Sequence, residues 1–186
     1  KALNQFYNKR KAALQSQLEN NRHTSARINR MNRLRDGRIT HYLHVASKRL
    51  VDHLAAEGIG TLVIGKNDRW KQEANLGRRN NQNFVQIPHA RFIEMVTYKA
   101  RLQGLRVIYQ EESYTSKCSF LDLEPVEKQP VYLGKRITRS LFRAAEGRLI
   151  HADVNGAYNI IRKATPAAFA HGIEGAVVRP LRLTPA

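Results

Sequence analysis

The sequence predicts an α/β fold preceded by a basic helical hairpin, and three observations support this prediction. Apolar residues recur at three- and four-residue steps over 1–19 and again over 25–56, which is typical of amphipathic helices. Two short apolar segments, 61–64 and 105–109, lie on either side of a third helical pattern that follows Pro88. A strand, a helix and a second strand in this order predict a βαβ unit with parallel strands.

The basic character of the chain indicates a polyanionic partner. Its 186 residues include 32 Lys and Arg against 15 Asp and Glu, which gives a net charge of +17. An excess of this size is typical of proteins that bind nucleic acid. In the second helix, the candidate phosphate contacts lie opposite the apolar stripe: Arg27, Arg30, Arg33 and Arg38. A solvated helix surface is the alternative, and the scarcity of acids nearby favours phosphate contacts.

Residues 66–83 are polar and rich in asparagine, and predict a long surface loop. Its basic and aromatic residues are further candidates for nucleic-acid contacts: Lys66, Trp70, Arg78 and Arg79. Trp70 is suited to stacking on a base, but an anchoring contact within the protein explains it equally well.

Composition excludes several classes of protein. The single cysteine, Cys118, rules out an internal disulfide and indicates a reducing compartment. No apolar run is long enough to span a membrane, and the chain does not begin with a signal-peptide pattern. We therefore expect a cytoplasmic protein with no membrane partner.

Two carboxylates follow the second predicted strand, at the edge where parallel sheets bind their ligands. Such sheets bind ligands beyond the carboxyl ends of their strands, and these ends are Gly65 and the pair Glu111 and Glu112. A helix over 153–163 is predicted to begin with Asp153 as its N-cap. Mg²⁺ prefers oxygen ligands, and two such ions about 3.5–4 Å apart can flank a scissile phosphate, so Glu112 and Asp153 are candidates for part of a two-metal site. A solvated glutamate pair and an ordinary helix cap are the alternatives.

Two residues beside Asp153 are open to more than one interpretation. Asn155 is interpreted as helping to position water or metal near that carboxylate. His151 is interpreted as a structural or supporting residue rather than as a ligand.

Two stretches of the chain carry a family resemblance. Residues 112–117 (ESYTSK) and 147–160 (GRLIHADVNGAYNI) resemble the C-terminal half of TnpB, the transposon-encoded OrfB family of RNA-guided DNA nucleases related to type V CRISPR effectors. Residues 62–67 and 86–89 resemble one branch of that family. The resemblance implies a partial RNase H-like (RuvC-like) domain that cuts DNA with Mg²⁺ or Mn²⁺, directed by a guide RNA to a target DNA.

The resemblance also assigns roles to the acids. Asp153 matches the third metal-binding acid of the family. The second acid usually ends the strand matching 61–64, where this chain has Gly65. The related branch places that acid on the next strand, which implies Glu112, with Glu111 as the second choice.

The first aspartate of the family has no match in residues 1–60. We therefore expect a C-terminal part that is inactive alone and needs the missing N-terminal part of the same protein. The alternative function is a nuclease-inactive RNA-guided DNA-binding protein or an RNA-binding accessory fragment.

Many family members carry a four-cysteine zinc ribbon between the last two motifs. One cysteine cannot form such a site, so we expect the region 113–150 to be degenerate and free of zinc, with a strand or hairpin over 131–143. The expected organisation is a basic helical hairpin over 1–57, a nuclease core over 58–163 and a loosely packed tail over 164–186.

Overall fold

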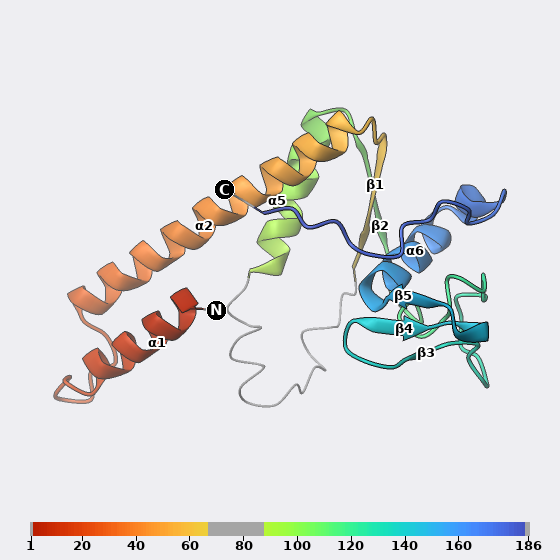
Figure 1. The fold of residues 1–186 in the computed structure, drawn as a ribbon. Coiled ribbons are helices and arrows are strands. Elements are labelled where there is room, and N and C mark those ends of the chain that lie inside the picture. Colours follow the sequence, from red (N-terminus) through yellow and green to blue (C-terminus); the bar gives the residue numbers. More distant parts are fainter. Residues whose placement is uncertain (1, 67–87, 185–186) are drawn as a thin grey trace. The chain divides into compact units, whose positions relative to one another are not determined.

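The computed structural model describes residues 2–66 and 88–184, which form two units (Figure 1). Residues 2–57, 88–103 and 184 belong to the first unit, and residues 58–66 and 104–183 belong to the second. Helices and strands both occur, so the predicted α/β class is confirmed. None of the described helices is both long and apolar enough to cross a membrane.

The described part of the first unit is helical, and its elements are α1 (Ala2–Gln15), α2 (Ala26–Ala56) and α5 (His89–Leu102). The first two helices form the predicted hairpin, seen in red and orange in Figure 1. Ser25 caps α2, since its hydroxyl accepts a hydrogen bond from the Ile28 N–H at 3.3 Å. The helices are joined by side chains: the Tyr7 hydroxyl donates to Asn32 Oδ1 at 2.6 Å.

The helix α5 packs against α2. Lys99 fixes this contact, because its ammonium donates to the hydroxyl of Ser47 and to the carbonyl oxygen of His44, both at 2.7 Å. The buried apolar residues of these two helices include Leu43, Val51, Met95, Val96 and Ala100. A helix was predicted after Pro88, and this prediction is confirmed.

The described part of the second unit contains two small sheets and the helix α6. Its elements are β1 (Thr61–Gly65), β2 (Arg106–Gln110), β3 (Lys135–Arg136), β4 (Leu141–Arg143), β5 (Leu149–His151) and α6 (Ala152–Ala164), with short 3-10 helices at Ala145–Gly147 and Pro166–Phe169. The strands β1 and β2 pair in parallel, from Thr61 opposite Arg106 to Gly65 opposite Gln110, which confirms the predicted pairing. Short apolar strands of this kind are usually buried on both faces of a parallel sheet, but most residues of β1 and β2 are only half-buried. The reason is that the described sheet has two strands, with α6 packed on both.

The strands β3, β4 and β5 form an antiparallel sheet. The hairpin predicted within 131–143 is confirmed in part, since residues 131–134 precede the first strand rather than forming one. The core beneath this sheet contains Phe120, Phe142 and Ile150, all almost fully buried. Tyr158 of α6 stacks on Phe120 with ring centroids 4.2 Å apart, so the helix and the irregular region share one core.

The segment after α6 is more ordered than predicted. Phe169 packs edge-on against Phe120, with centroids 5.0 Å apart. The N–H of His151 donates to the carbonyl oxygen of Val178 at 2.9 Å, and the N–H of Val177 donates to the Tyr158 hydroxyl at 2.9 Å. These contacts attach the tail to the second unit and correct the expectation of loose packing.

Candidate functional site

The Glu112 side chain lies in the space that Gly65 leaves empty at the end of β1. A Cβ added to Gly65 would overlap Glu112 Oε1 and would come within 2.8 Å of Ile160 Cδ1, closer than real Cβ contacts allow. The carboxylate that follows β2 therefore occupies the position where a side chain of β1 would begin. Partial burial, with a smaller contribution from Glu111, raises the pKa of Glu112.

The neighbouring Glu111 is engaged elsewhere. Its carboxylate accepts a hydrogen bond from the Lys163 ammonium at 2.7 Å and others from the hydroxyl and the N–H of Ser113. The bond from Lys163, followed by those from Ser113, lowers the pKa of Glu111 to about 2. Among the described residues no cation pairs with Glu112, so the two adjacent carboxylates differ in their availability.

Asp153 lies in the first turn of α6 and its side chain is largely exposed. The prediction that Asp153 is the N-cap of this helix is wrong. His151 occupies that position, and its Nδ1 accepts a hydrogen bond from the Asp153 N–H at 3.3 Å. His151 rather than Asp153 caps the helix, because β5 continues to His151 and the helix begins at Ala152.

A guanidinium lies beside the Asp153 carboxylate. Arg136 of β3 donates to Asp153 Oδ1 at 3.4 Å and also to the carbonyl oxygen of Arg139 at the end of the same hairpin. Nothing in the sequence distinguishes Arg136 from the other basic residues of this region. Its proximity to Asp153 could not be predicted, since it depends on the pairing of β3, β4 and β5.

The helix α6 relates the two candidate acids to each other. Ile160 borders the space occupied by Glu112, and Asp153 lies seven residues, or two turns, earlier on the same side of the helix. Two turns correspond to about 10 Å along the helix axis. No group of three or more His, Cys, Asp or Glu side chains gathers within residues 2–66 and 88–184. Glu112 and Asp153 therefore share one face of α6 without forming a complete cluster.

Two buried asparagines of α6 hold the segment that follows Glu112. Asn155 accepts from the N–H of Phe120 at 2.9 Å and donates to the carbonyl oxygen of Cys118 at 2.9 Å. Asn159 donates to the same carbonyl and to that of Thr115. The interpretation of Asn155 as a residue that positions water or metal is therefore wrong. Asn159 was missed, although its spacing of four from Asn155 was visible in the sequence.

The irregular region 113–150 is held together by carboxylates. Glu124, which is buried, accepts from the N–H groups of Ser119 at 2.6 Å and Leu133 at 2.9 Å. Asp122 accepts from the Ala145 N–H at 2.9 Å and from the Arg148 guanidinium at 2.6 Å. The Cys118 thiol is buried beside the carbonyl oxygen of Glu127, and burial raises its pKa.

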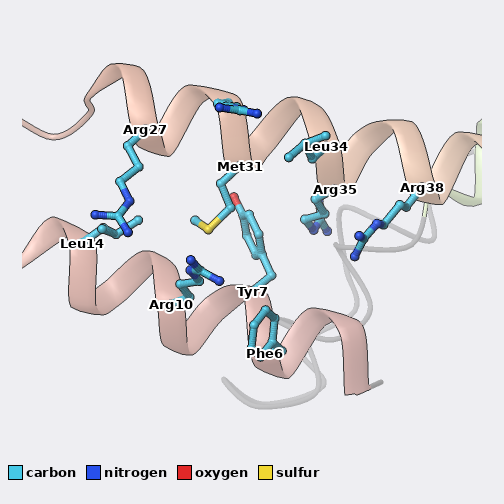
Figure 2. Close-up of a pocket in the computed structure, with 10 residues that line it drawn as sticks. Phe6, Tyr7, Arg10, Leu14, Arg27, Met31, Leu34, Arg35 and Arg38 are labelled. Carbon is cyan, nitrogen blue, oxygen red and sulfur yellow. The ribbon is translucent and has the colours of Figure 1, made fainter.

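A groove runs between α1 and α2, with a volume of about 390 Å³ (Figure 2). Five arginines and five largely apolar residues line it: Arg10, Arg27, Arg30, Arg35 and Arg38, with Phe6, Tyr7, Leu14, Met31 and Leu34. The prediction that the arginines of α2 lie opposite its apolar stripe is therefore wrong for Arg27, Arg30 and Arg38. They share the groove with Met31 and Leu34, because residues three or four apart lie on the same face of a helix.

The other predicted nucleic-acid contacts lie elsewhere. Arg33 is exposed on α2 and is not among the residues lining the groove. Lys66 follows β1, and its ammonium lies 5.8 Å from the ring centroid of Tyr109. Trp70, Arg78 and Arg79 lie outside the described residues.

Two family models match this chain. A model described as "Cas12f1-like, TNB domain" matches residues 89–160, and OrfB_IS605, described as "Probable transposase", matches residues 1–71. Together they include the basic hairpin, β1 and β2, and most of α6.

A curated protein and a solved structure are similar to the chain. The TnpB-like protein ORF457 of Acidianus two-tailed virus is 25% identical over 130 residues, which cover 68% of this chain and 25% of that protein. The chain thus spans about a quarter of the length of this relative. A protein in the cryo-EM structure of the Cas12f1–sgRNA–target DNA complex superposes with a TM-score of 0.56 at 16% identity, over 83% of this chain and 40% of that one. This second likeness is one of fold.

Proposed function

Because the chain belongs to the TnpB family and is related to type V effectors, we propose that it is the C-terminal portion of an RNA-guided, Mg²⁺-dependent DNA endonuclease. The observation that carries this proposal is the Glu112 carboxylate in the space left by Gly65. It supplies an acid at the carboxyl end of β1, where parallel sheets bind their ligands. The fold neighbour was solved with sgRNA and target DNA, and we propose guide RNA and target DNA as partners here.

The residues present fit a hard divalent cation in their donor chemistry. Glu112 and Asp153 offer carboxylate oxygens, which Mg²⁺ and Mn²⁺ accept, and both side chains are reachable from solvent. Glu112 and Asp153 are the residues that would hold the metal ions. When bound, such ions polarise the scissile phosphate and lower the pKa of an attacking water.

The chain's own groups prepare this site. Lys163 and Ser113 hold Glu111 and keep its negative charge neutralised. Glu112 is left without an ion pair among the described residues, so it need not give up a partner to bind a cation. Arg136 orients Asp153 and places a guanidinium at the rim, where it is suited to donate to a phosphate oxygen.

We propose that the region 113–150 folds without zinc. Its only sulfur ligand is Cys118, whose thiol is buried. The hydrogen bonds of Asp122 and Glu124 hold the loops that a bound ion would otherwise join.

The test is DNA cleavage by the complete polypeptide that the gene encodes, with its RNA and Mg²⁺. Glu112→Gln and Asp153→Asn are each expected to lower the cleavage rate by more than about 100-fold, because even outer-shell partners of a metal contribute 10–100-fold. Glu111→Gln is the matched control, since it removes an adjacent carboxylate of the same size, and its rate is expected to stay close to that of the wild type. Equal losses in Glu111→Gln and Glu112→Gln would contradict the assignment.

A nuclease-inactive RNA-guided DNA-binding protein, or an RNA-binding accessory fragment, is the second candidate. The observation that favours it is that the described residues bring no third acid to Glu112 and Asp153. Binding of RNA and DNA without cleavage by the unmodified complete protein, and without any effect of Mg²⁺ or of Glu112→Gln on binding, would establish this alternative.

A further inference from the structure

The groove between α1 and α2 combines positive charge with an exposed aromatic surface. Phe6 is 64% exposed and Leu34 is 59% exposed, so the apolar floor of the groove is open to solvent. Arg10 lies on the same helix as Phe6, with its guanidinium carbon 5.9 Å from the ring centroid. Figure 2 shows the arginine side chains of both helices around this floor.

Some of the lining residues hold the hairpin together rather than facing a ligand. The Tyr7 hydroxyl is bound to Asn32, and the Arg35 guanidinium lies 4.8 Å from the Tyr7 ring centroid and donates to Asn4. Asp36 pairs with Arg35 at 2.9 Å, so the charge of Arg35 is already compensated.

The remaining arginines of the groove are not compensated in this way. Among residues 2–66 and 88–184 no carboxylate pairs with Arg10, Arg27, Arg30 or Arg38, and no acid lines the groove. Four unpaired guanidinium groups around an exposed phenyl ring suit a ligand with both a negative charge and a flat apolar face. A nucleotide has both features.

We propose that this groove binds a single-stranded stretch of nucleic acid, with one unpaired base stacked on Phe6 and the adjacent phosphates on Arg10, Arg27 and Arg30. A duplex keeps its bases stacked on one another and would present only its sugar–phosphate backbone to Phe6. Stacking on aromatic side chains in a basic groove is the usual mode of single-strand recognition. The inference deepens the proposed function by naming where an unpaired segment is held. It does not depend on the carboxylate site.

The experiment measures binding of the complete polypeptide to fluorescently labelled oligonucleotides in EDTA, so cleavage plays no part. The probes are a single-stranded RNA, a single-stranded DNA of the same sequence, and the corresponding RNA duplex. Phe6→Ala is expected to weaken single-strand binding by roughly 5- to 150-fold, the loss of one stacked base. Phe6→Trp keeps a stacking surface and is expected to restore binding.

Two controls separate the groove from general charge and general exposure. Tyr42→Ala removes another exposed aromatic side chain of α2 that does not line the groove, and binding should not change. Arg30→Gln is expected to weaken single-strand binding more than Arg33→Gln, since only Arg30 lines the groove. A larger effect on RNA would assign the groove to the guide, and a larger effect on DNA would assign it to a displaced target strand.

The proposal is overturned if Phe6→Ala, with helix content unchanged by circular dichroism, leaves single-strand affinity intact or weakens duplex binding equally. A second result would also overturn it. In this result Phe6→Ala weakens the binding of a poly-glutamate peptide to the protein but does not change single-strand binding. A loss of single-strand binding in Phe6→Ala would stand even if Glu112→Gln proved fully active in cleavage. The two proposals therefore fail separately.

Discussion

Gly65 shows how the absence of a side chain can place a functional group. Because β1 ends in a residue without a Cβ, the Glu112 carboxylate can fold back from the end of β2 into the space beside Ile160. Any larger residue at this position would compete with Glu112 for that space. Gly65 and Glu112 therefore depend on each other. The glycine at the end of β1 leaves the space, and the acid that follows β2 fills it.

Gly65→Ala is therefore expected to lower DNA cleavage, because the added methyl group overlaps Glu112 Oε1 and pushes the carboxylate away. We expect a smaller loss than in Glu112→Gln, since the displaced carboxylate keeps its charge. The cleavage rate of the complete protein with RNA and Mg²⁺ measures this.

Gly156→Ala is the matched control for this variant. A Cβ added to Gly156 meets nothing within 4 Å, and the residue lies within α6. The control should keep its cleavage rate and gain about 1 kcal/mol of stability, because alanine is the better helix former. Unchanged cleavage in Gly65→Ala would contradict the role given to the space beside Glu112.

What the sequence could predict about these residues depends on how local their interactions are. The alternation of side chains along a strand does not extend to Glu111 and Glu112, because both residues follow the end of β2. It cannot show that Lys163, which is 52 residues from Glu111, holds that carboxylate. Asn155 was misjudged for the same reason: it is polar on an amphipathic helix, but its partners lie 35 and 37 residues away in the loop that it supports.

At the scale of elements, periodicity predicted the regular parts well. The three helices of the first unit and the two parallel strands were found because each repeats its pattern over several residues. The sheet formed by β3, β4 and β5 has strands of two or three residues, too short for an alternating pattern to be distinctive. The packing of Phe169 on Phe120 was unpredictable because it arises from tertiary contact alone.

Asp122 carries an element-scale prediction, because it connects the start of the irregular region to the turn between β4 and β5. Its side chain is 7% exposed and accepts from the Ala145 N–H and the Arg148 guanidinium. Asp122→Ala leaves both donors without this acceptor and is expected to lower the free energy of unfolding by about 1–3 kcal/mol at pH 7. Urea denaturation measures the difference.

The effect of Asp122→Ala should depend on pH. Burial opposes ionisation, but hydrogen bonds and the charge of Arg148 outweigh it and lower the pKa of Asp122 below its ordinary value of 3.8. A carboxyl with a lowered folded pKa stabilises the fold above its unfolded pKa, and this stability is lost as the pH falls below 3.8 through the folded value. The stability difference between wild type and Asp122→Ala should therefore shrink below about pH 4. Glu146→Gln, which changes an exposed acid in the same turn, is the control and should leave the free energy of unfolding at pH 7 close to that of the wild type.

At the scale of the whole molecule, charge is concentrated where the groove lies. The chain carries +17, and residues 1–50 contain 12 Lys and Arg against 2 acids. Long-range attraction from the net charge draws nucleic acid to any part of the protein. Direct phosphate contacts differ from it because each releases condensed counterions, which makes binding depend steeply on salt.

A triple substitution of Arg10, Arg27 and Arg30 by glutamine is expected to reduce the salt dependence of single-strand binding. If each arginine contacts one phosphate, the slope of log K against log salt should become shallower by about 2, because each contact contributes roughly 0.7 for single strands. Fluorescence titrations of the complete protein between low and physiological salt give this slope.

The matched control replaces three exposed basic residues of the second unit, Arg106, Lys128 and Arg179, and removes the same number of positive charges. Equal changes of slope in the two variants would mean that only net charge matters and that the groove makes no phosphate contacts. A change confined to the first variant would locate the contacts on the hairpin.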